Sequence, residues 1–529
     1  MRRPQQCSLC ASGLLVFFSI WQAGHVWAGP PVQANFPAAL NGDRVRLSSI
    51  SLGDLGQDGL PEIVVGTNDG KVHAYTRNGT KLWDYDTGAM AIEGKAAIGD
   101  VDGDGFAEVV VGAGSTFTPN AHGGLYVIDH MGNLQCDFKT LDATSTPDGW
   151  RDGVYSSPAL ADLDGNDGGL LEIAFGAWDR RVRVIHHDCT VLWENNVYDA
   201  VWGSPAIGDV NRDGQLDVVI GVDGDSLNPP IPVAAQDGGL LYVYDGKTGA
   251  VIAGFPRQVD EVLWSSPALG DLDGDGFLEI VVGTGYCWAN PNCAVDRDDP
   301  NVGKEIHAWD HLGNVLPGWP VDLVDKYAFA SPALADLDDD GELEVIVNTI
   351  DPDDVQGGLV YVLNPDGSNV PGWPTQPTTV NASNDTFHTS TNASPVVADL
   401  TGDGQLEVLL ASSFEIVVWD RNGNQLTLQT WPPPPADLYL KIPFAIASSP
   451  AVGDIDGDGD VELVVGSADG TGSVGTIYAW DFSGAASAAA LPWPMFRANA
   501  PNQANASVEH IFADGFESGN TSAWSASAP

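Results

Sequence analysis

The sequence has few basic residues: 22 Lys and Arg stand against 72 Asp and Glu among 529 residues, a formal net charge of −50. Binding to phosphate backbones or to anionic lipid depends on clustered Lys and Arg, so this balance excludes nucleic acid as a partner and also excludes electrostatic membrane docking. A hydrophobic fraction of 43% is nevertheless enough for a packed core, which excludes a disordered chain.

Long apolar runs are also missing, apart from a short one near the N-terminus. Arg2 and Arg3 precede the run Leu14–Trp21, and Val26–Ala28 offers a cleavage site for signal peptidase. The run is shorter than the roughly 18 to 20 residues that a membrane anchor requires, so we interpret residues 1–28 as a secretory signal peptide. We therefore expect an exported protein of bacterial type, secreted or at the cell surface, without a transmembrane segment.

Cysteine is scarce: of six residues, two lie in the signal peptide and four remain. Export permits disulfides. Cys287 and Cys293 flank a short segment, and we expect them to close one loop. Cys136 and Cys189 are then the two cysteines left over, and their pairing follows only by elimination, since a sequence does not specify disulfide connectivity.

What the sequence has in abundance is an internal repeat. The segment Ser265–Gly283, SSPALGDLDGDGFLEIVVG, recurs with variation along the chain. Repeats of roughly 45 to 65 residues indicate a propeller or another stacked architecture. The first aspartate of the acidic stretch is found eight times, at Asp54, Asp100, Asp162, Asp209, Asp271, Asp336, Asp399 and Asp454.

Each repeat carries signals for four antiparallel strands, A to D. A small-residue strand enters the acidic loop, a β-branched strand such as EIVVG leaves it, and an alternating strand such as KVHAY follows. A turn such as Arg77-Asn78-Gly79 then leads into a short fourth strand. Four short antiparallel strands per repeat are typical of a propeller blade. The sequence therefore predicts an all-β fold, an eight-bladed β-propeller of four-stranded antiparallel blades over residues 45–500, in which the acidic stretches form the A–B loops.

Aromatic-proline pairs bear on the closure of the ring. Such pairs follow several fourth strands, and both ends of the chain carry one, at Phe36-Pro37 and Trp493-Pro494. Either end therefore suits the outer strand of the last blade, and residues 29–44 are a lead-in and a candidate closing strand. Residues 501–529 are rich in Ala, Ser and Asn and are expected to form a flexible tail.

The acidic loop has the ligand pattern of a calcium site. Oxygen-bearing side chains occupy positions 1, 3 and 5, glycine occupies position 6, and a carboxylate occupies position 9. Hard oxygen ligands converging in a tight loop suit Ca²⁺. An EF-hand is excluded because its last ligand is at position 12, between helices. The alternative, that these residues only form hairpin turns, would explain one loop but not eight in register.

The eight loops predict up to eight Ca²⁺ sites. Five of these loops have a complete ligand set. The ligands expected in the complete loops are Asp100, Asp102, Asp104 and Glu108; Asp209, Asn211, Asp213 and Asp217; Asp271, Asp273, Asp275 and Glu279; Asp336, Asp338, Asp340 and Glu344; and Asp454, Asp456, Asp458 and Glu462. Gly56 and Thr401 replace position 3 in two loops, and the third loop has two extra residues. The ligands expected in these degraded loops are Asp54, Asp58 and Glu62; Asp162, Asp164, Asn166 and Glu172; and Asp399, Asp403 and Glu407.

With these loops the chain resembles the FG-GAP, or VCBS, repeat proteins, which include the N-terminal propellers of integrin α-subunits. The phrase that names the repeat survives loosely, as in Ala174-Phe175-Gly176-Ala177. The resemblance implies an extracellular, calcium-stabilised scaffold for adhesion or recognition. Some polysaccharide lyases also use eight-bladed calcium propellers, which keeps a polysaccharide-active enzyme as the alternative.

Insertions and aromatic residues both favour a binding site on the face opposite the calcium loops. The insertions fall in the B–C and D–A connections, and long loops on a rigid scaffold usually carry binding. Aromatic rings at the channel mouth on that face suit a glycan or an extracellular protein ligand, or they only fill the channel top between blades. The candidate ligand-binding residues, each seven positions before the first aspartate of a loop, are Glu93, Tyr155, Trp202, Trp264, Phe329 and Asn392.

Catalytic motifs are missing: the sequence has no GxSxG elbow, no HExxH and no phosphate loop. A lyase-like site at the channel mouth would have Glu93 or His388 to use, with Arg46 as a charge partner. Strand alternation, however, points Arg46 away from the channel. The sequence therefore favours a calcium-binding recognition module over an enzyme, and it does not name the ligand.

Overall fold

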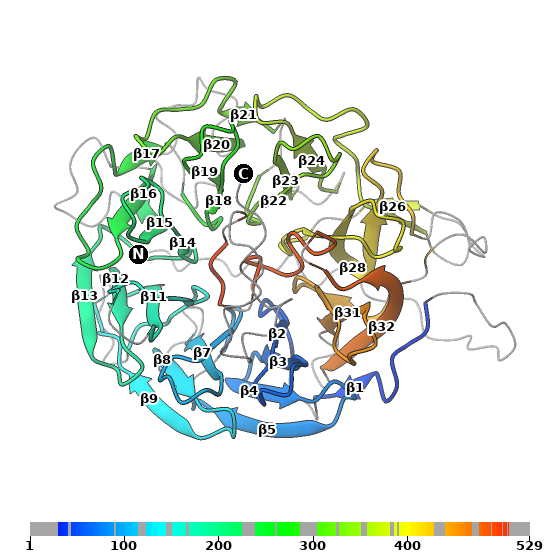
Figure 1. Cartoon of the computed structure of the whole chain (residues 1–529), viewed down its shortest axis with the longest axis horizontal. Coiled ribbons are helices and arrows are strands. Elements are labelled where there is room, and N and C mark those ends of the chain that lie inside the picture. The colour runs from blue at the N-terminus through cyan, green and yellow to red at the C-terminus, as the bar shows by residue number, and fades with distance from the viewer. Residues whose placement is uncertain are drawn as a thin grey trace, which may run out of the picture.

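The computed structural model of the chain shows β-sheets arranged as eight blades around a central channel (Figure 1). It describes residues 30–40, 44–88, 91–114, 123–143, 151–165, 169–224, 238–259, 262–285, 304–323, 327–350, 357–380, 386–388, 391–427, 438, 440–467, 475–487, 489–499, 501–504 and 506. Over these residues all regular elements are strands, and there is no helix long and apolar enough to cross a bilayer. The predicted all-β, eight-bladed propeller is confirmed.

The first four blades each contain four strands paired in chain order. Blade 1 consists of β2 (Ser51–Gly53), β3 (Glu62–Gly66), β4 (Lys71–Tyr75) and β5 (Lys81–Asp86). Blade 2 consists of β6 (Ala97–Gly99), β7 (Glu108–Ala113), β8 (Gly124–Ile128) and β9 (Leu134–Phe138). Blade 3 consists of β10 (Ala159–Ala161), β11 (Glu172–Ala177), β12 (Arg181–Ile185) and β13 (Val191–Asn196). Blade 4 consists of β14 (Ala206–Gly208), β15 (Asp217–Gly224), β16 (Gly238–Asp245) and β17 (Arg257–Val259).

The other four blades follow the same plan with small variations. Blade 5 consists of β18 (Ala268–Gly270), β19 (Glu279–Gly283), β20 (Glu305–Trp309) and β21 (Val321–Asp322). Blade 6 consists of β22 (Ala333–Ala335), β23 (Glu344–Asn348) and β24 (Val360–Leu363), with a bridge from Val360 to Thr375 in place of a fourth strand. Blade 7 consists of β27 (Val396–Ala398), β28 (Glu407–Trp419) and β29 (Lys441–Ile446). Blade 8 consists of β30 (Ala451–Gly453), β31 (Asp460–Ser467), β32 (Thr476–Ala485) and β1 (Ala38–Ala39).

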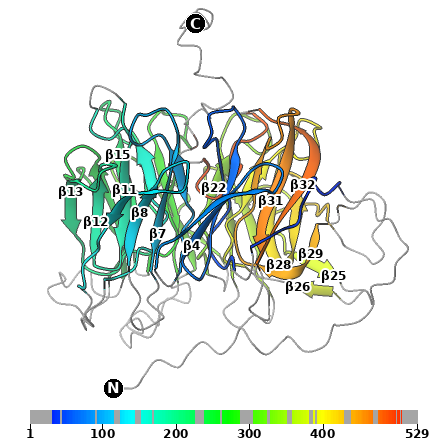
Figure 2. The same ribbon diagram turned by 90° about the horizontal axis from the view of Figure 1, so that it is seen from below.

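An extra hairpin stands between blades 6 and 7. It pairs β25 (Thr378–Val380) with β26 (Thr386–His388). Figure 2 shows it at the lower edge of the ring, beyond the ends of the blade strands.

The N-terminal strand closes the ring. Ala38 and Ala39 of β1 pair with Ile477 and Thr476 of β32, the outermost chain-order strand of blade 8. The other candidate, Trp493, instead pairs with Val397 on the innermost strand of blade 7. The outer edge of the last blade is therefore supplied by residues 30–40.

Both faces of each sheet are buried against the neighbouring blades, which is why the second and third strands are mostly apolar. All six residues of β7, for example, are buried. Tryptophans in or near the outer edges of four blades join them to the adjacent blade, because each of these indole Nε1 groups donates a hydrogen bond to a carbonyl in the C–D turn of the next blade. These bonds run from Trp83 to His130, from Trp193 to Gly246, from Trp319 to Pro365 and from Trp373 to Arg421.

A ring of serine hydroxyls links the innermost segments around the channel. At each step a backbone N–H of one blade donates to a serine Oγ of the next, over 2.8 to 3.2 Å. Lys95 takes the equivalent position in blade 2, where the series of serines is interrupted. The accepting serines are Ser157, Ser204, Ser266, Ser331, Ser394, Ser449 and Ser49.

The chain re-enters the channel after the last blade, and we call residues 489–499, 501–504 and 506 the C-terminal plug. In Figure 1 the orange-red end of the described chain lies in the middle of the ring. Residues 501–504 and Ala506, expected to be part of a flexible tail, instead contact the innermost strands of the propeller. The rest of that expected tail and the expected signal peptide lie outside the described residues. The N–H groups of Leu160, Ile207 and Leu269 donate to the carbonyls of Pro501, Gln503 and Ala504.

One disulfide links neighbouring blades. Cys136 of β9 and Cys189, in the turn after β12, are bonded, and their sequence separation is 53. This is the pair that remained by elimination in the sequence. The expected Cys287–Cys293 pair lies outside the described residues.

Candidate metal centres and channel mouth

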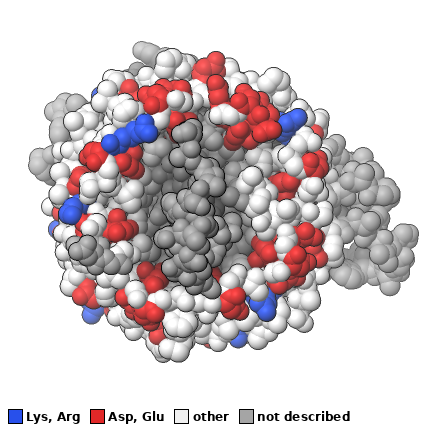
Figure 3. Space-filling model, in the orientation of Figure 1, with Lys and Arg blue, Asp and Glu red and all other residues white. Residues whose placement is uncertain are grey.

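The eight acidic loops lie between the innermost strand of each blade and the next strand, and a common hydrogen-bond pattern shapes them. In seven loops the first aspartate accepts the N–H of the glycine at position 6, over 2.8 to 3.0 Å. Those glycines have φ between 81° and 94°, a conformation that side chains disfavour. The turn leaves the other aspartate oxygens at the loop surface, where acidic side chains gather in separate groups around the ring (Figure 3).

The carboxylate that ends each loop, at position 9 or, in the third loop, two residues later, is anchored in the same way in all eight. One of its oxygens accepts the N–H of the residue at position 2, over 2.7 to 3.1 Å. The bond aims the second oxygen at the loop interior. This anchor follows from the position of the acid at the start of the second strand, which the sequence pattern already showed.

Predicted ligands converge in at least four of the loops, where carboxylate oxygens of three residues lie within 4.8 Å of one another. The converging groups are Asp100, Asp102 and Glu108; Asp271, Asp273 and Glu279; Asp336, Asp338 and Asp340; and Asp399, Asp403 and Glu407. A fifth group has a different composition and contains Asp164, Glu172 and His186.

The complete loops contain buried oxygens that lack a donor. The second oxygens of Glu108, Asp217, Glu279 and Glu462 are buried and have no hydrogen-bond partner among the described residues. Burial raises the pKa of Glu279 to about 8, the Leu272 N–H opposes this rise, and the three loop aspartates add to it. Hard, convergent and unpartnered oxygens fit a divalent cation such as Ca²⁺, which would supply the missing positive charge.

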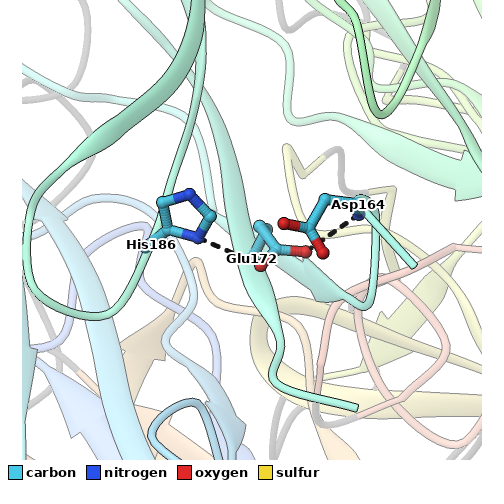
Figure 4. Close-up of side chains that lie close together, drawn as sticks. All are labelled: Asp164, Glu172 and His186. Carbon is cyan, nitrogen blue, oxygen red and sulfur yellow. Dashed lines mark hydrogen bonds and ion pairs between the residues drawn. The ribbon is translucent and has the colours of Figure 1, made fainter. Parts of the chain in front are cut away.

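The degraded loops use donors of the protein instead. In the third loop, Nδ1 of His186 lies 3.2 Å from Oε1 of Glu172, and Oε2 accepts the N–H of Asp164 (Figure 4). In the seventh loop, the hydroxyl of Thr401 donates to Oε1 of Glu407. The sequence pattern did not predict that His186 and Thr401 replace a cation. The hydroxyl of Thr401 at position 3, where other loops have a ligand, was the only sequence signal for such a replacement. Asn166 lies outside the described residues.

In the first loop a positive charge lies beside the position-5 acid, Asp58. Nη1 of Arg77 lies 3.7 Å from Oδ2 of Asp58, across the turn that follows β4. Each of the three loops with an incomplete ligand set thus has an internal cation or donor beside a predicted ligand.

The raised pKa values predict how the metal-free protein responds to pH. Burial raises the pKa of Glu462 to about 8 and that of Glu108 to about 7, from the ordinary value of 4.5. The folded state therefore holds protons that the unfolded state releases, so the free energy of unfolding falls as pH rises from about 5 to 8. We expect the melting temperature of the metal-stripped protein to fall over this range. The calcium-loaded protein is the control and should show a flatter profile, and a rise with pH in the stripped protein would contradict this account.

Aromatic side chains of four successive blades meet at the opposite end of the channel. We call Tyr155, Trp202, Trp264 and Phe329 the aromatic arc. Neighbouring ring centroids lie 5.1, 4.9 and 5.1 Å apart along it. Each of the four side chains is partly exposed. The structure thus brings together the four aromatic residues that sequence spacing placed at the mouth.

Two further aromatic rings extend the arc. Trp178 packs edge-on against Trp202, with ring centroids 4.0 Å apart, and Tyr327 stacks on Phe329 at 5.9 Å. Asn392, also predicted at the mouth, is exposed on blade 7. His388 ends β26, and its side chain is outside the described residues.

A polar pair adjoins the arc. Nη1 of Arg46 lies 3.6 Å from Oε1 of the buried Glu93, so the expectation that Arg46 points away from the channel is wrong. The irregular backbone before β2 breaks the strand alternation on which that expectation rested. Oε2 of Glu93 is buried without a partner in the described chain, and burial raises its pKa while Arg46 lowers it. Burial raises the pKa of Tyr155, and the negative charge of Glu93 raises it further. The Glu93 carboxyl therefore lies beside the arc.

Family comparison agrees with the loop geometry. A model of the FG-GAP-like repeat matches residues 54–111, 336–410 and 399–465, and a model of the FG-GAP repeat matches residues 95–128 and 263–286. Every matched segment contains at least one of the acidic loops. The matched segments of this β-propeller are FG-GAP repeats. Human integrin alpha-6 is 28% identical over 200 residues, which are 35% of this chain and only 15% of the integrin.

Solved structures resemble this FG-GAP propeller in fold. The V. cholerae biofilm matrix protein Bap1 gives a TM-score of 0.55 at 15% identity, covering 90% of this chain and 96% of Bap1. The Bacillus licheniformis rhamnogalacturonan lyase PL11 gives 0.51 at 16% identity, covering 87% and 76% of the two chains. The exotype rhamnogalacturonan lyase YesX gives 0.53 at 15% identity, covering 90% and 80%. Matrix proteins and enzymes thus share the fold, which by itself does not separate recognition from catalysis.

Proposed function

We propose that this FG-GAP propeller is an exported, calcium-stabilised recognition module that binds a glycan or an extracellular protein at the mouth of its channel, opposite the calcium loops. The observation that carries the proposal is the aromatic arc. Partly exposed rings from four blades form one continuous surface there, with Glu93 and Arg46 beside it. Aromatic surfaces with a few polar groups are typical of sites for sugars and for peptide side chains.

Calcium has a supporting role in this proposal. In the complete loops it would be held by the carboxylates at positions 1, 3, 5 and 9 and would neutralise their mutual repulsion. The loops would then hold the innermost strands, whose other ends carry the aromatic arc. Calcium would therefore stabilise the platform without touching the ligand.

Removing two central rings tests the recognition site. We expect the double substitution Trp202→Ala and Trp264→Ala to weaken ligand binding by about tenfold or more, since each buried aromatic contact contributes roughly 0.5–1.5 kcal/mol or more. Binding is measured on arrays of glycans and of extracellular matrix proteins, with the melting temperature recorded in parallel.

A ring on the opposite face supplies the matched control. Phe106 is 36% exposed and stacks on His130 at 4.2 Å, so Phe106→Ala removes a similar ring far from the mouth. This variant should bind normally. Normal binding by a folded Trp202 and Trp264 double variant would show that the arc only fills the channel top.

A polysaccharide-active enzyme, lyase-like and with its site at the channel mouth, is the second candidate. The observation that favours it is Oε2 of Glu93, which is buried beside Arg46 and has no partner in the part of the chain that the structure describes, because a carboxyl with a raised pKa is suited to proton transfer. Incubation with a polysaccharide panel, followed by assays for unsaturated and reducing ends, tests this reading. New ends that Glu93→Gln abolishes would establish an enzyme, and a blank panel would leave recognition.

A further inference from the structure

The C-terminal plug surrounds a buried lysine with backbone oxygens. The Lys95 side chain, which replaces the serine of the ring in blade 2, is fully buried. Its Nζ donates to the carbonyl of Phe496 at 3.0 Å and to that of Asn499 at 2.8 Å. An ammonium group has three N–H donors, so the described residues use two of the three.

The plug itself places a second cation in the channel. Arg497, between the two residues that accept from Lys95, is only 1% exposed. Its Nη1 donates to the carbonyl of Pro267 at 2.7 Å, and its Nη2 donates to that of Pro205 at 2.5 Å. Its Nε is buried and has no hydrogen-bond partner within the described part of the chain.

The two cations influence each other and have no acidic partner among the residues that the structure describes. Burial lowers the pKa of Lys95 well below its ordinary value, and the charge of Arg497 lowers it further. Carbonyl oxygens are the only acceptors that either side chain has among the described residues. Two buried like charges without a counter-charge are costly, and structures normally provide an opposite charge for them.

We propose that the channel binds a small inorganic anion, chloride under ordinary conditions, at the free donors of Lys95 and Arg497. The free donors belong to two cationic side chains, which disfavours a metal ion, although Oδ1 of Asn502, whose Nδ2 donates to the Lys95 carbonyl, is also buried without a partner among the described residues. It lies among fully buried side chains between the plug and the innermost strands, which excludes a large ligand. A water molecule would satisfy Nε of Arg497 but would leave both charges uncompensated.

The anion would also stabilise the contact between the C-terminal plug and the blades. Lys95 belongs to blade 2, whereas Arg497 belongs to the plug and contacts the carbonyls of blades 4 and 5. Binding one anion to both side chains would tie the C-terminal segment to the ring. Asn502, whose Nδ2 donates to the carbonyl of Pro158, holds the returning part of the plug at blade 3.

Bromide is the direct probe of this site. Crystals of the full calcium-loaded protein grown in sodium bromide should show an anomalous peak in contact with Nζ of Lys95 and Nε of Arg497. Density without anomalous signal at this position, as for water or for a carboxylate of the chain itself, would overturn the proposal.

Thermal melts test the same site in solution. At equal ionic strength and with saturating calcium, we expect the melting temperature to be about 3 °C higher in sodium chloride than in sodium methanesulfonate, because an anion that binds only the folded state stabilises it. Lys95→Met should abolish this difference, and Lys139→Met, at an exposed rim lysine, should retain it. Equal melting temperatures in both salts for the natural protein would contradict the proposal. If Lys95→Met does not fold, the bromide peak in the natural protein decides.

Discussion

Removal of calcium is expected to lower the melting temperature of this protein by more than 10 °C or to unfold it at room temperature. In the metal-free state, the complete loops hold buried carboxylate oxygens to which no described residue donates, and burial raises the pKa of Glu279 to about 8. A ligand present at 100 times its Kd stabilises the folded state by about 2.7 kcal/mol per site, so several sites together contribute on the order of 10 kcal/mol. Calorimetry of the protein with calcium and with a chelator measures the effect.

The loops themselves provide matched variants for this experiment. Glu279→Gln removes a carboxylate from a complete loop, whereas Glu407→Gln changes the seventh loop, where Thr401 already donates to the acid. We expect about five bound ions by elemental analysis, one fewer after Glu279→Gln and no change after Glu407→Gln. Magnesium that restores stability as well as calcium, or chelation without any shift, would contradict a calcium assignment.

Deletion of residues 488–529 is expected to have the second large effect, because it removes the C-terminal plug. Trp493 is 1% exposed, and the plug makes backbone hydrogen bonds to innermost strands of blades 3, 4, 5, 7 and 8. Loss of a buried tryptophan side chain alone costs roughly 3–5 kcal/mol. We expect the shortened chain to melt more than 10 °C lower than the full chain or to be recovered unfolded.

A chain that ends at Ala506 is the control for this deletion. It retains every described residue of the plug and should melt within a few degrees of the full chain. Trp493→Ala is the milder variant and should give an intermediate loss of stability. A synthetic peptide of residues 489–506 should restore part of the lost stability in trans. Equal melting temperatures for the chains ending at residues 487 and 506 would show that the ring does not need the plug.

Much of the candidate site could be predicted because its determinants are local. The ligands of a complete loop lie within nine residues, so the spacing of Asp271, Asp273, Asp275 and Glu279 already specifies their convergence. The aromatic arc was predictable for a related reason: Trp202 and Trp264 occupy the same position in adjacent blades, and a ring brings equivalent positions side by side. The donors that replace a cation, such as His186 beside Glu172, come from another turn of the blade and have no fixed spacing.

The sequence by itself determined the number of blades, the order of their strands and the positions of the acidic loops. These features depend on alternation, turn residues and repeat spacing, all of which act over short stretches of chain. Only the tertiary structure decided that β1 rather than the C-terminal end closes the ring, that Cys136 pairs with Cys189, and that Arg46 approaches Glu93. The tertiary structure alone also placed Arg497 beside Lys95, about 400 residues away in the chain. Contacts across a closed ring depend on where the chain emerges from the last blade, and no local sequence pattern specifies that position.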